Sequence, residues 1–138
     1  AAVVAAGGDA APVRRPMAPL DVLLVEDDPA VATLAEAMLR ELGHEVTLAI
    51  HPTDALAQLE GPSRFTLLLT DVVMPGDMTG VDLARQVVAA RPDLPVLLSS
   101  GYTGQILDSA EDAPWPLLRK PYTLDALAAA IAAAVEGA

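Results

Sequence analysis

Short apolar segments alternate with amphipathic segments along most of this chain, and this alternation constrains the fold more than any other feature. Helical spacing of apolar residues follows each of the first three apolar segments and also the last one. Strands that alternate with helices form a parallel sheet covered on both faces. The sequence therefore predicts an α/β, doubly wound, five-stranded parallel sheet. Its predicted strands are residues 22–25, 45–50, 65–70, 96–99 and 117–119, and its clearest helices are 29–42, 53–60, 81–90 and 123–135.

The first helix has the clearest sequence signals. Asp28 is a candidate N-cap, Pro29 occupies the first helical position, and Gly43 is a C-terminal stop. We expect one apolar stripe of this helix to face the core, and it consists of Val31, Leu34, Ala35, Met38, Leu39 and Leu42.

The segment between the fourth and fifth strands is harder to interpret. Residues 108–114 contain three acids and Pro114 and have no clear apolar stripe, so we expect a fourth helix within 104–113 to be short, irregular or mobile. In the final helix, 123–135, four residues are expected to face inward: Leu124, Leu127, Ala128 and Ile131.

The first 19 residues differ in composition from the rest. They are rich in Ala, Gly and Pro and show no apolar period, so we interpret 1–19 as a linker or tail and 20–138 as the folded domain. A linker suggests a preceding segment, and the absence of an initial Met fits a fragment of a longer protein.

Composition excludes several classes of function. The chain has 138 residues, enough for one domain, and its net charge of −11 disfavours binding to nucleic acid or to an anionic membrane. It has no cysteine, which excludes disulfides, thiolate zinc sites and a cysteine nucleophile. No apolar run approaches the ~20 residues of a membrane span. These features predict a cytoplasmic domain whose natural complement is a metal cation or a partner with a basic surface.

Polar residues directly follow four of the predicted strands. In doubly wound sheets, ligands bind beyond the carboxyl ends of the strands, which is where these residues lie. Glu26 and Asp27 follow the first strand and Asp71 the third, whereas Ser100 and Lys120 follow the fourth and fifth. Three converging carboxylates need protonation or a cation, and an all-oxygen ligand set suits Mg²⁺. A lone acid here would more often be a turn or cap residue, which is our interpretation of Asp28.

Ser100 and Lys120 add a hydroxyl group and a positive charge to the three carboxylates. Alone, Ser100 would be an ordinary loop hydroxyl and Lys120 a surface lysine, but Lys120 is the only lysine in the chain. A hydroxyl and a cation facing a metal-bound carboxylate are what phosphoryl transfer requires. The carboxylate itself can be the nucleophile, which gives an acyl phosphate.

Four motifs in order resemble the receiver domain of two-component response regulators. The resemblance covers about residues 21 to 135, and its motifs are LLVEDDP (23–29), LLLTDVVMPGDMTG (67–80), VLLSSGY (96–102) and RKPY (119–122). It implies the flavodoxin-like (CheY-like) strand order 2-1-3-4-5.

The resemblance also implies roles for individual residues. Asp71 is the expected phosphoacceptor, Ser100 the hydroxyl, and Lys120 the phosphoryl-pairing cation. Asp27 is the expected direct Mg²⁺ ligand, with Glu26 acting mainly through water and the backbone carbonyl of Val73 completing the set. The Lys120–Pro121 peptide bond is expected to be cis.

Some positions depart from the family pattern. The segment Met74–Gly80 is one residue longer than usual, and Leu117 replaces a common Tyr or Phe, so the usual aromatic switch is in doubt. Tyr102 is a candidate for part of that role, although packing against the fourth helix is the simpler interpretation. The loop, the SSGY motif and the linker resemble receivers at the C-terminus of hybrid sensor histidine kinases, and stand-alone receivers share these features.

The expected partner is a histidine kinase or a phosphotransfer domain, which would dock on the first helix and on the loop after the fifth strand. The domain itself is expected to be a monomer and a phosphoacceptor rather than a dedicated enzyme. A pseudo-receiver that only mediates interactions is an alternative, which the complete residue set disfavours. An Asp-nucleophile hydrolase would need an acid where Val73 stands, and a dinucleotide-binding domain would need a Gly-rich turn after the first strand.

Overall fold

The computed structural model describes residues 3–4, 18–61, 64–73, 76, 78–101 and 114–136. The strands in this part of the chain are β1 (Val3–Val4), β2 (Asp21–Val25), β3 (Glu45–Ala49), β4 (Leu67–Asp71), β5 (Val96–Ser100) and β6 (Leu117–Arg119). The helices are α1 (Pro29–Glu41), α2 (Pro52–Glu60), α3 (Gly80–Ala90) and α5 (Leu124–Glu136).

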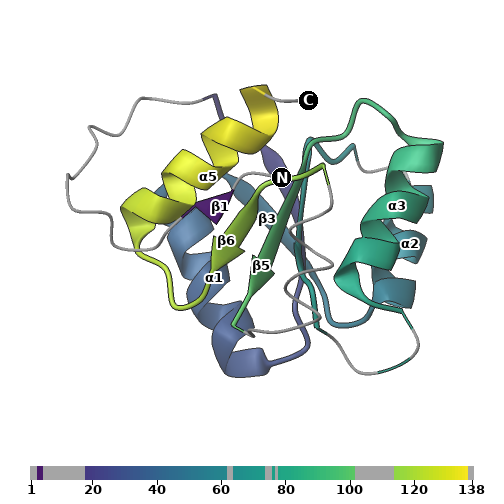
Figure 1. Cartoon of the computed structure of the whole chain (residues 1–138), viewed down its shortest axis with the longest axis horizontal. Helices are drawn as coiled ribbons and strands as arrows, with labels where there is room; N and C mark the ends of the chain where they lie inside the picture. Colours follow the sequence, from purple (N-terminus) through teal and green to yellow (C-terminus); the bar gives the residue numbers. More distant parts are fainter. Residues whose placement is uncertain are drawn as a thin grey trace.

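All the strands pair in parallel in one sheet with the order β1-β6-β5-β4-β2-β3 (Figure 1). The five predicted strands are β2 to β6, and their arrangement is the predicted order 2-1-3-4-5. The order reverses beside β2, which lies between β3 and β4. In doubly wound sheets this is where the ligand crevice forms.

The sheet has one strand that the sequence did not predict. Within the segment interpreted as a linker, Val3 and Val4 pair with Leu117 and Leu118 of β6. The boundary between the linker (1–19) and the folded domain (20–138) remains a prediction.

Two hydrophobic clusters cover the two faces of the sheet, because successive side chains of a strand point to opposite faces. Leu23 and Val25 pack with α2 and α3, whereas Val22 and Leu24 pack with α1 and α5. Figure 1 shows the two pairs of helices on opposite sides of the sheet. Strand β4 is buried along its whole length, as expected for a central strand.

Helix α1 confirms the predicted cap and corrects the predicted stripe. The Asp28 side chain accepts hydrogen bonds from the N–H groups of Ala30 and Val31, at 2.9 and 3.3 Å. Leu34, however, is 63% exposed, and Ala32 is buried instead. The prediction for Leu34 was wrong because the buried arc of the helix is centred on Ala32, Ala35 and Leu39.

Smaller corrections concern the later elements. Ser100 is the last residue of β5 rather than the first loop residue, because its backbone still takes part in the ladder with β6. In α5, Leu127 and Ile131 are buried as predicted, whereas Leu124 and Ala128 are only half-buried. The predicted fourth helix and Tyr102 lie outside the described residues, and no described helix is long and apolar enough to cross a membrane.

Candidate functional site

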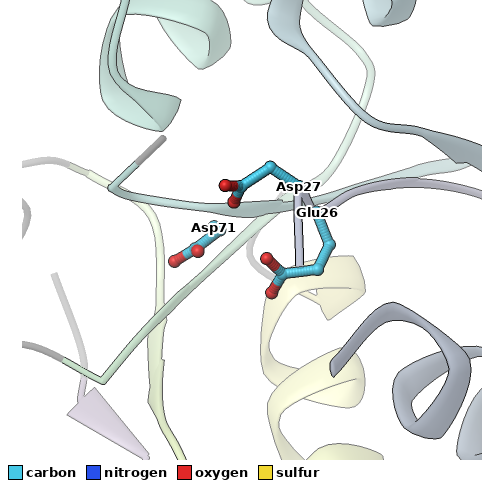
Figure 2. A group of neighbouring side chains, drawn as sticks. All are labelled: Glu26, Asp27 and Asp71. Carbon is cyan, nitrogen blue, oxygen red and sulfur yellow. The ribbon is translucent and has the colours of Figure 1, made fainter. Parts of the chain in front are cut away.

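Three carboxylates meet at the carboxyl edge of the sheet. Strand β2 ends immediately before Glu26 and Asp27, and the neighbouring β4 ends at Asp71. One carboxylate oxygen from each residue lies within 4.8 Å of the others. Figure 2 shows the three side chains converging from these two strand ends. The structure thus brings together the three predicted metal-binding carboxylates.

The Asp71 carboxyl is the most perturbed acid in the described part of the chain. It is buried, and burial raises its pKa to about 6, with the charge of Glu26 adding to the rise. The charge of Lys120 and a hydrogen bond from the Val73 backbone N–H act in the opposite direction. Desolvation dominates because a carboxylate loses more hydration than these partners restore.

Lys120 follows β6, which lies two strands from β4 and three strands from β2, and its side chain still contacts acids from both. Its Nζ lies 2.5 Å from Glu26 Oε1 and 3.3 Å from Asp71 Oδ2. Burial lowers the pKa of Lys120, but the hydrogen bond to Glu26 and the charge of Asp71 more than offset this, and the net pKa is raised. Lys120 is therefore an ammonium ion at neutral pH. The predicted cis bond between Lys120 and Pro121 is present.

The ion pair between Lys120 and Glu26 was not predicted from the sequence. Glu26 is buried, and its second oxygen, Oε2, accepts a hydrogen bond of 3.2 Å from the Asp28 N–H. The sequence indicated only that the two residues share an edge. The pairing depends on the reach of the lysine side chain across β5 and β4, which a linear pattern does not show.

Gly80 fixes the backbone behind Asp71. Its N–H donates to the Val72 carbonyl at 2.8 Å, and a Cβ on Gly80 would collide with the Asp71 carbonyl oxygen and lie 2.8 Å from its carbonyl carbon. Only glycine allows α3 to begin this close to β4. The sequence placed Gly80 at the end of a long loop without assigning it this contact.

Ser100 and Val73 lie at the same edge of the sheet as the three carboxylates. Ser100 is buried at the end of β5, and its carbonyl accepts a bond of 2.9 Å from the Lys120 N–H. Val73 is half-buried and contacts the Asp71 carboxyl through its backbone N–H. The roles of the Ser100 hydroxyl and the Val73 carbonyl remain predictions. Met74, Pro75 and Tyr102 lie outside the described residues.

One aromatic residue near the site was not singled out from the sequence for any role. Tyr122, two residues after Lys120, is half-buried, and burial together with the charges of Glu26 and Asp71 raises the pKa of its phenol to about 12. It packs against the cluster beneath α1 and α5. Its signal in the sequence was its place in RKPY (119–122).

The donor set fits a hard divalent cation. It consists of carboxylate oxygens only, which Mg²⁺ prefers, and no described cysteine or histidine lies in the cluster. Lys120 is the cation that contacts the cluster, and it compensates only part of its negative charge. The same edge offers a nucleophilic carboxylate and an ammonium within 3.3 Å of each other.

Comparison with known proteins identifies a matching family. A family model described as the response regulator receiver domain matches residues 22–132. The match covers all the described helices and strands except β1 and the ends of β2 and α5.

Individual relatives agree with this match. The chain is 35% identical over 105 residues to the response regulator receiver protein CpdR of Brucella abortus, covering 75% of this chain and 86% of that protein. It is 32% identical to the transcriptional regulatory protein ZraR of Salmonella typhimurium over 78% of this chain, but it spans only 24% of that protein. A response regulator receiver domain protein from Clostridium thermocellum has a similar crystal structure, with a TM-score of 0.72, 27% identity and coverage of 85% and 94% of the two chains.

Proposed function

The chain belongs to the family of response regulator receiver domains, and from this premise we propose that Asp71 accepts a phosphoryl group from a phosphohistidine of a kinase or phosphotransfer domain. The observation that carries the proposal is the contact of Lys120 with both Asp71 and Glu26 beside Asp27. This arrangement supplies a nucleophile, a fixed positive charge and a cation-binding set at one place.

The proposed reaction is an in-line displacement at phosphorus. An Asp71 carboxylate oxygen forms the new P–O bond while the P–N bond to the donor imidazole breaks, and the imidazole takes up a proton. Lys120 balances charge on the transferring group, and the Ser100 hydroxyl donates a hydrogen bond to it after transfer. The product is an acyl phosphate on Asp71.

Asp27, Asp71, Glu26 and the Val73 carbonyl are the residues proposed to hold Mg²⁺. When bound, this ion neutralises phosphoryl oxygens. The carboxylates of the site repel one another without it, so the residues themselves favour binding of a divalent cation.

Phosphorylation by a small-molecule donor tests the proposal directly. With acetyl phosphate and Mg²⁺, we expect the intact mass of the protein to rise by one phosphoryl group. Asp71→Asn should abolish the modification. Asp28→Asn is the matched control, because the Asp28 side chain lies close by and caps α1 but is not one of the clustered carboxylates.

Three outcomes would contradict the proposal. They are an unmodified wild-type protein, modification that persists in Asp71→Asn, and equal loss in Asp28→Asn. A beryllium fluoride mimic with Mg²⁺ should also perturb the NMR signals of Asp71 and Ser100. An unchanged spectrum would favour the pseudo-receiver alternative.

Hydrolysis of the phosphorylated protein provides a second prediction. Val73 lies two residues after Asp71, where an attacking water would approach, and its side chain cannot activate water. We expect slow dephosphorylation, with Val73→Asn losing phosphate about tenfold faster in a radiolabel or Phos-tag time course. Faster loss from the wild type than from Val73→Asn would contradict this.

A separate proposal concerns the larger protein that contains this domain. We propose that this receiver is part of a hybrid histidine kinase, on the basis of its SSGY motif and its Ala/Pro-rich segment 1–19. The full reading frame tests this, because a kinase core upstream would support it. A stand-alone reading frame would contradict it and leave the phosphoacceptor proposal intact.

A further inference from the structure

Strand β1 pairs with the outer edge of β6. Val3 pairs with Leu117 and Val4 with Leu118, both in parallel, and β1 also contacts α5. Figure 1 shows β1 beside β6 near α5, far in sequence from both. Without β1, β6 would be the edge strand of the described sheet.

The backbone of β6 alternates between its two neighbours. Pro116 accepts a hydrogen bond from Leu98, and the Lys120 N–H donates to Ser100, so the backbone of these two residues faces β5. Successive residues of a strand direct their N–H and C=O groups to opposite sides. The N–H groups of Leu117 and Arg119 therefore face the edge where β1 lies.

An open edge next to β6 would be a site for strand addition. Leu117 and Leu118 are fully buried, and unpaired N–H and C=O groups on an edge strand template the pairing of another chain. The sequence AAVVAA at 1–6 is uncharged and carries two β-branched residues, which favours extended structure.

We propose that the outer edge of β6 is a binding site for an extended, uncharged segment parallel to it, and that Val3–Val4 occupies this site as a displaceable sixth strand. A pairing two residues long forms only a few backbone hydrogen bonds, so its net stabilisation is small. A partner strand of the same chemistry can therefore compete with it. Strand β6, which carries this edge, ends directly before Lys120, the proposed phosphoryl-binding cation.

Amide hydrogen exchange in the full chain tests the occupancy. In Val3→Pro/Val4→Pro, which removes the backbone donors of β1, the Leu117 and Arg119 amides should exchange several-fold faster. The Lys120 amide, which is bonded to Ser100, should be unchanged and is the internal control. Val3→Ile/Val4→Ile should behave as the wild type.

A variant that lacks residues 1–4 tests the binding site itself. A peptide of residues 1–8, added at millimolar concentration, should slow exchange of the Leu117 and Arg119 amides in that variant. The same peptide with prolines at both valine positions should have no effect. The proposal is overturned if these two amides exchange equally in the full chain, in the double-proline variant and in the variant that lacks residues 1–4. It is also overturned if the unmodified peptide gives no protection, or if the proline-containing peptide protects the two amides equally well.

Discussion

At the scale of single residues, the site is a balance of opposing effects on Asp71. Burial and the charge of Glu26 disfavour its ionised form, whereas Lys120 and the Val73 N–H favour it. The result is a pKa of about 6, so the Asp71 carboxyl is mostly ionised at neutral pH and can act as a nucleophile.

Two substitutions should move this pKa in opposite directions. Lys120→Met removes a stabilising charge and should raise the pKa of Asp71 above 6. Glu26→Gln removes a repulsive charge and should lower it. Carbon-13 NMR of the Asp71 carboxyl measures both, and Mg²⁺ should lower the wild-type value. Shifts in the same direction would contradict this assignment of causes.

The same perturbation predicts an effect on stability. The folded state holds the Asp71 proton more tightly than the unfolded state, so this carboxyl's contribution to stability is lost as pH rises from about 4 through 6. Without Mg²⁺ at pH 7, Asp71→Asn should therefore be more stable than the wild type by an amount on the order of 1 kcal/mol, after discounting for solvent screening.

At the scale of elements, the joint between β4 and α3 fixes the backbone of Asp71, the proposed phosphoacceptor. Thr79 and Asp82 form a capping box that starts α3, with hydrogen bonds of 3.1 Å in both directions. Gly80 then lies against the Asp71 backbone. The helix start and the strand end are thus packed backbone to backbone, which leaves no room for a side chain.

Gly80→Ala should accordingly be destabilising. The added methyl group would force β4 and α3 apart, with an expected cost of about 1–3 kcal/mol in urea unfolding. Gly101→Ala is the matched control, because among the described residues the nearest atom to a Cβ there would be Lys120 Cβ, at an ordinary 3.8 Å. Equal stability of the two variants would show that the close approach at Gly80 is not limiting.

At the scale of the whole molecule, the two ends of the sheet respond to pH in opposite ways. The site lies at the carboxyl edge, whereas His44 lies at the amino edge, immediately before β3. His44 is buried, and its Nδ1 accepts a hydrogen bond of 3.0 Å from the Leu20 N–H. Burial lowers the pKa of His44 below 6.5. The neutral imidazole is therefore the form that the fold requires.

This predicts a loss of stability in mild acid that originates far from the site. The stability contributed by neutral His44 is complete above about pH 6.5 and is lost as pH falls through the lowered pKa. The loss should be about 1 kcal/mol, the net value of the Leu20 hydrogen bond. His44→Asn, whose Oδ1 can accept the same bond without titrating, should remove the loss between pH 7 and 5 in chemical denaturation.

Much of this architecture was predictable because it depends on local patterns. The apolar runs identified every strand from β2 to β6, and Asp28 and Pro29 marked the start of α1. The convergence of Glu26, Asp27 and Asp71 was predictable for the same reason, since parallel strands end at one edge of the sheet. The exposure of Leu34 was not predictable in this way. Apolar spacing defines the direction of a buried stripe but not its width, which depends on the elements that pack against the helix.

The sequence by itself determined the order of elements, the acidic edge and the family. Only the tertiary structure decided which groups touch, namely that Lys120 pairs with Glu26 as well as Asp71, that Gly80 packs on the Asp71 backbone, and that Val3–Val4 pairs with β6. Each of these contacts joins segments distant in the chain. Their existence depends on side-chain reach and backbone separation across the sheet, and neither quantity is encoded in a local pattern.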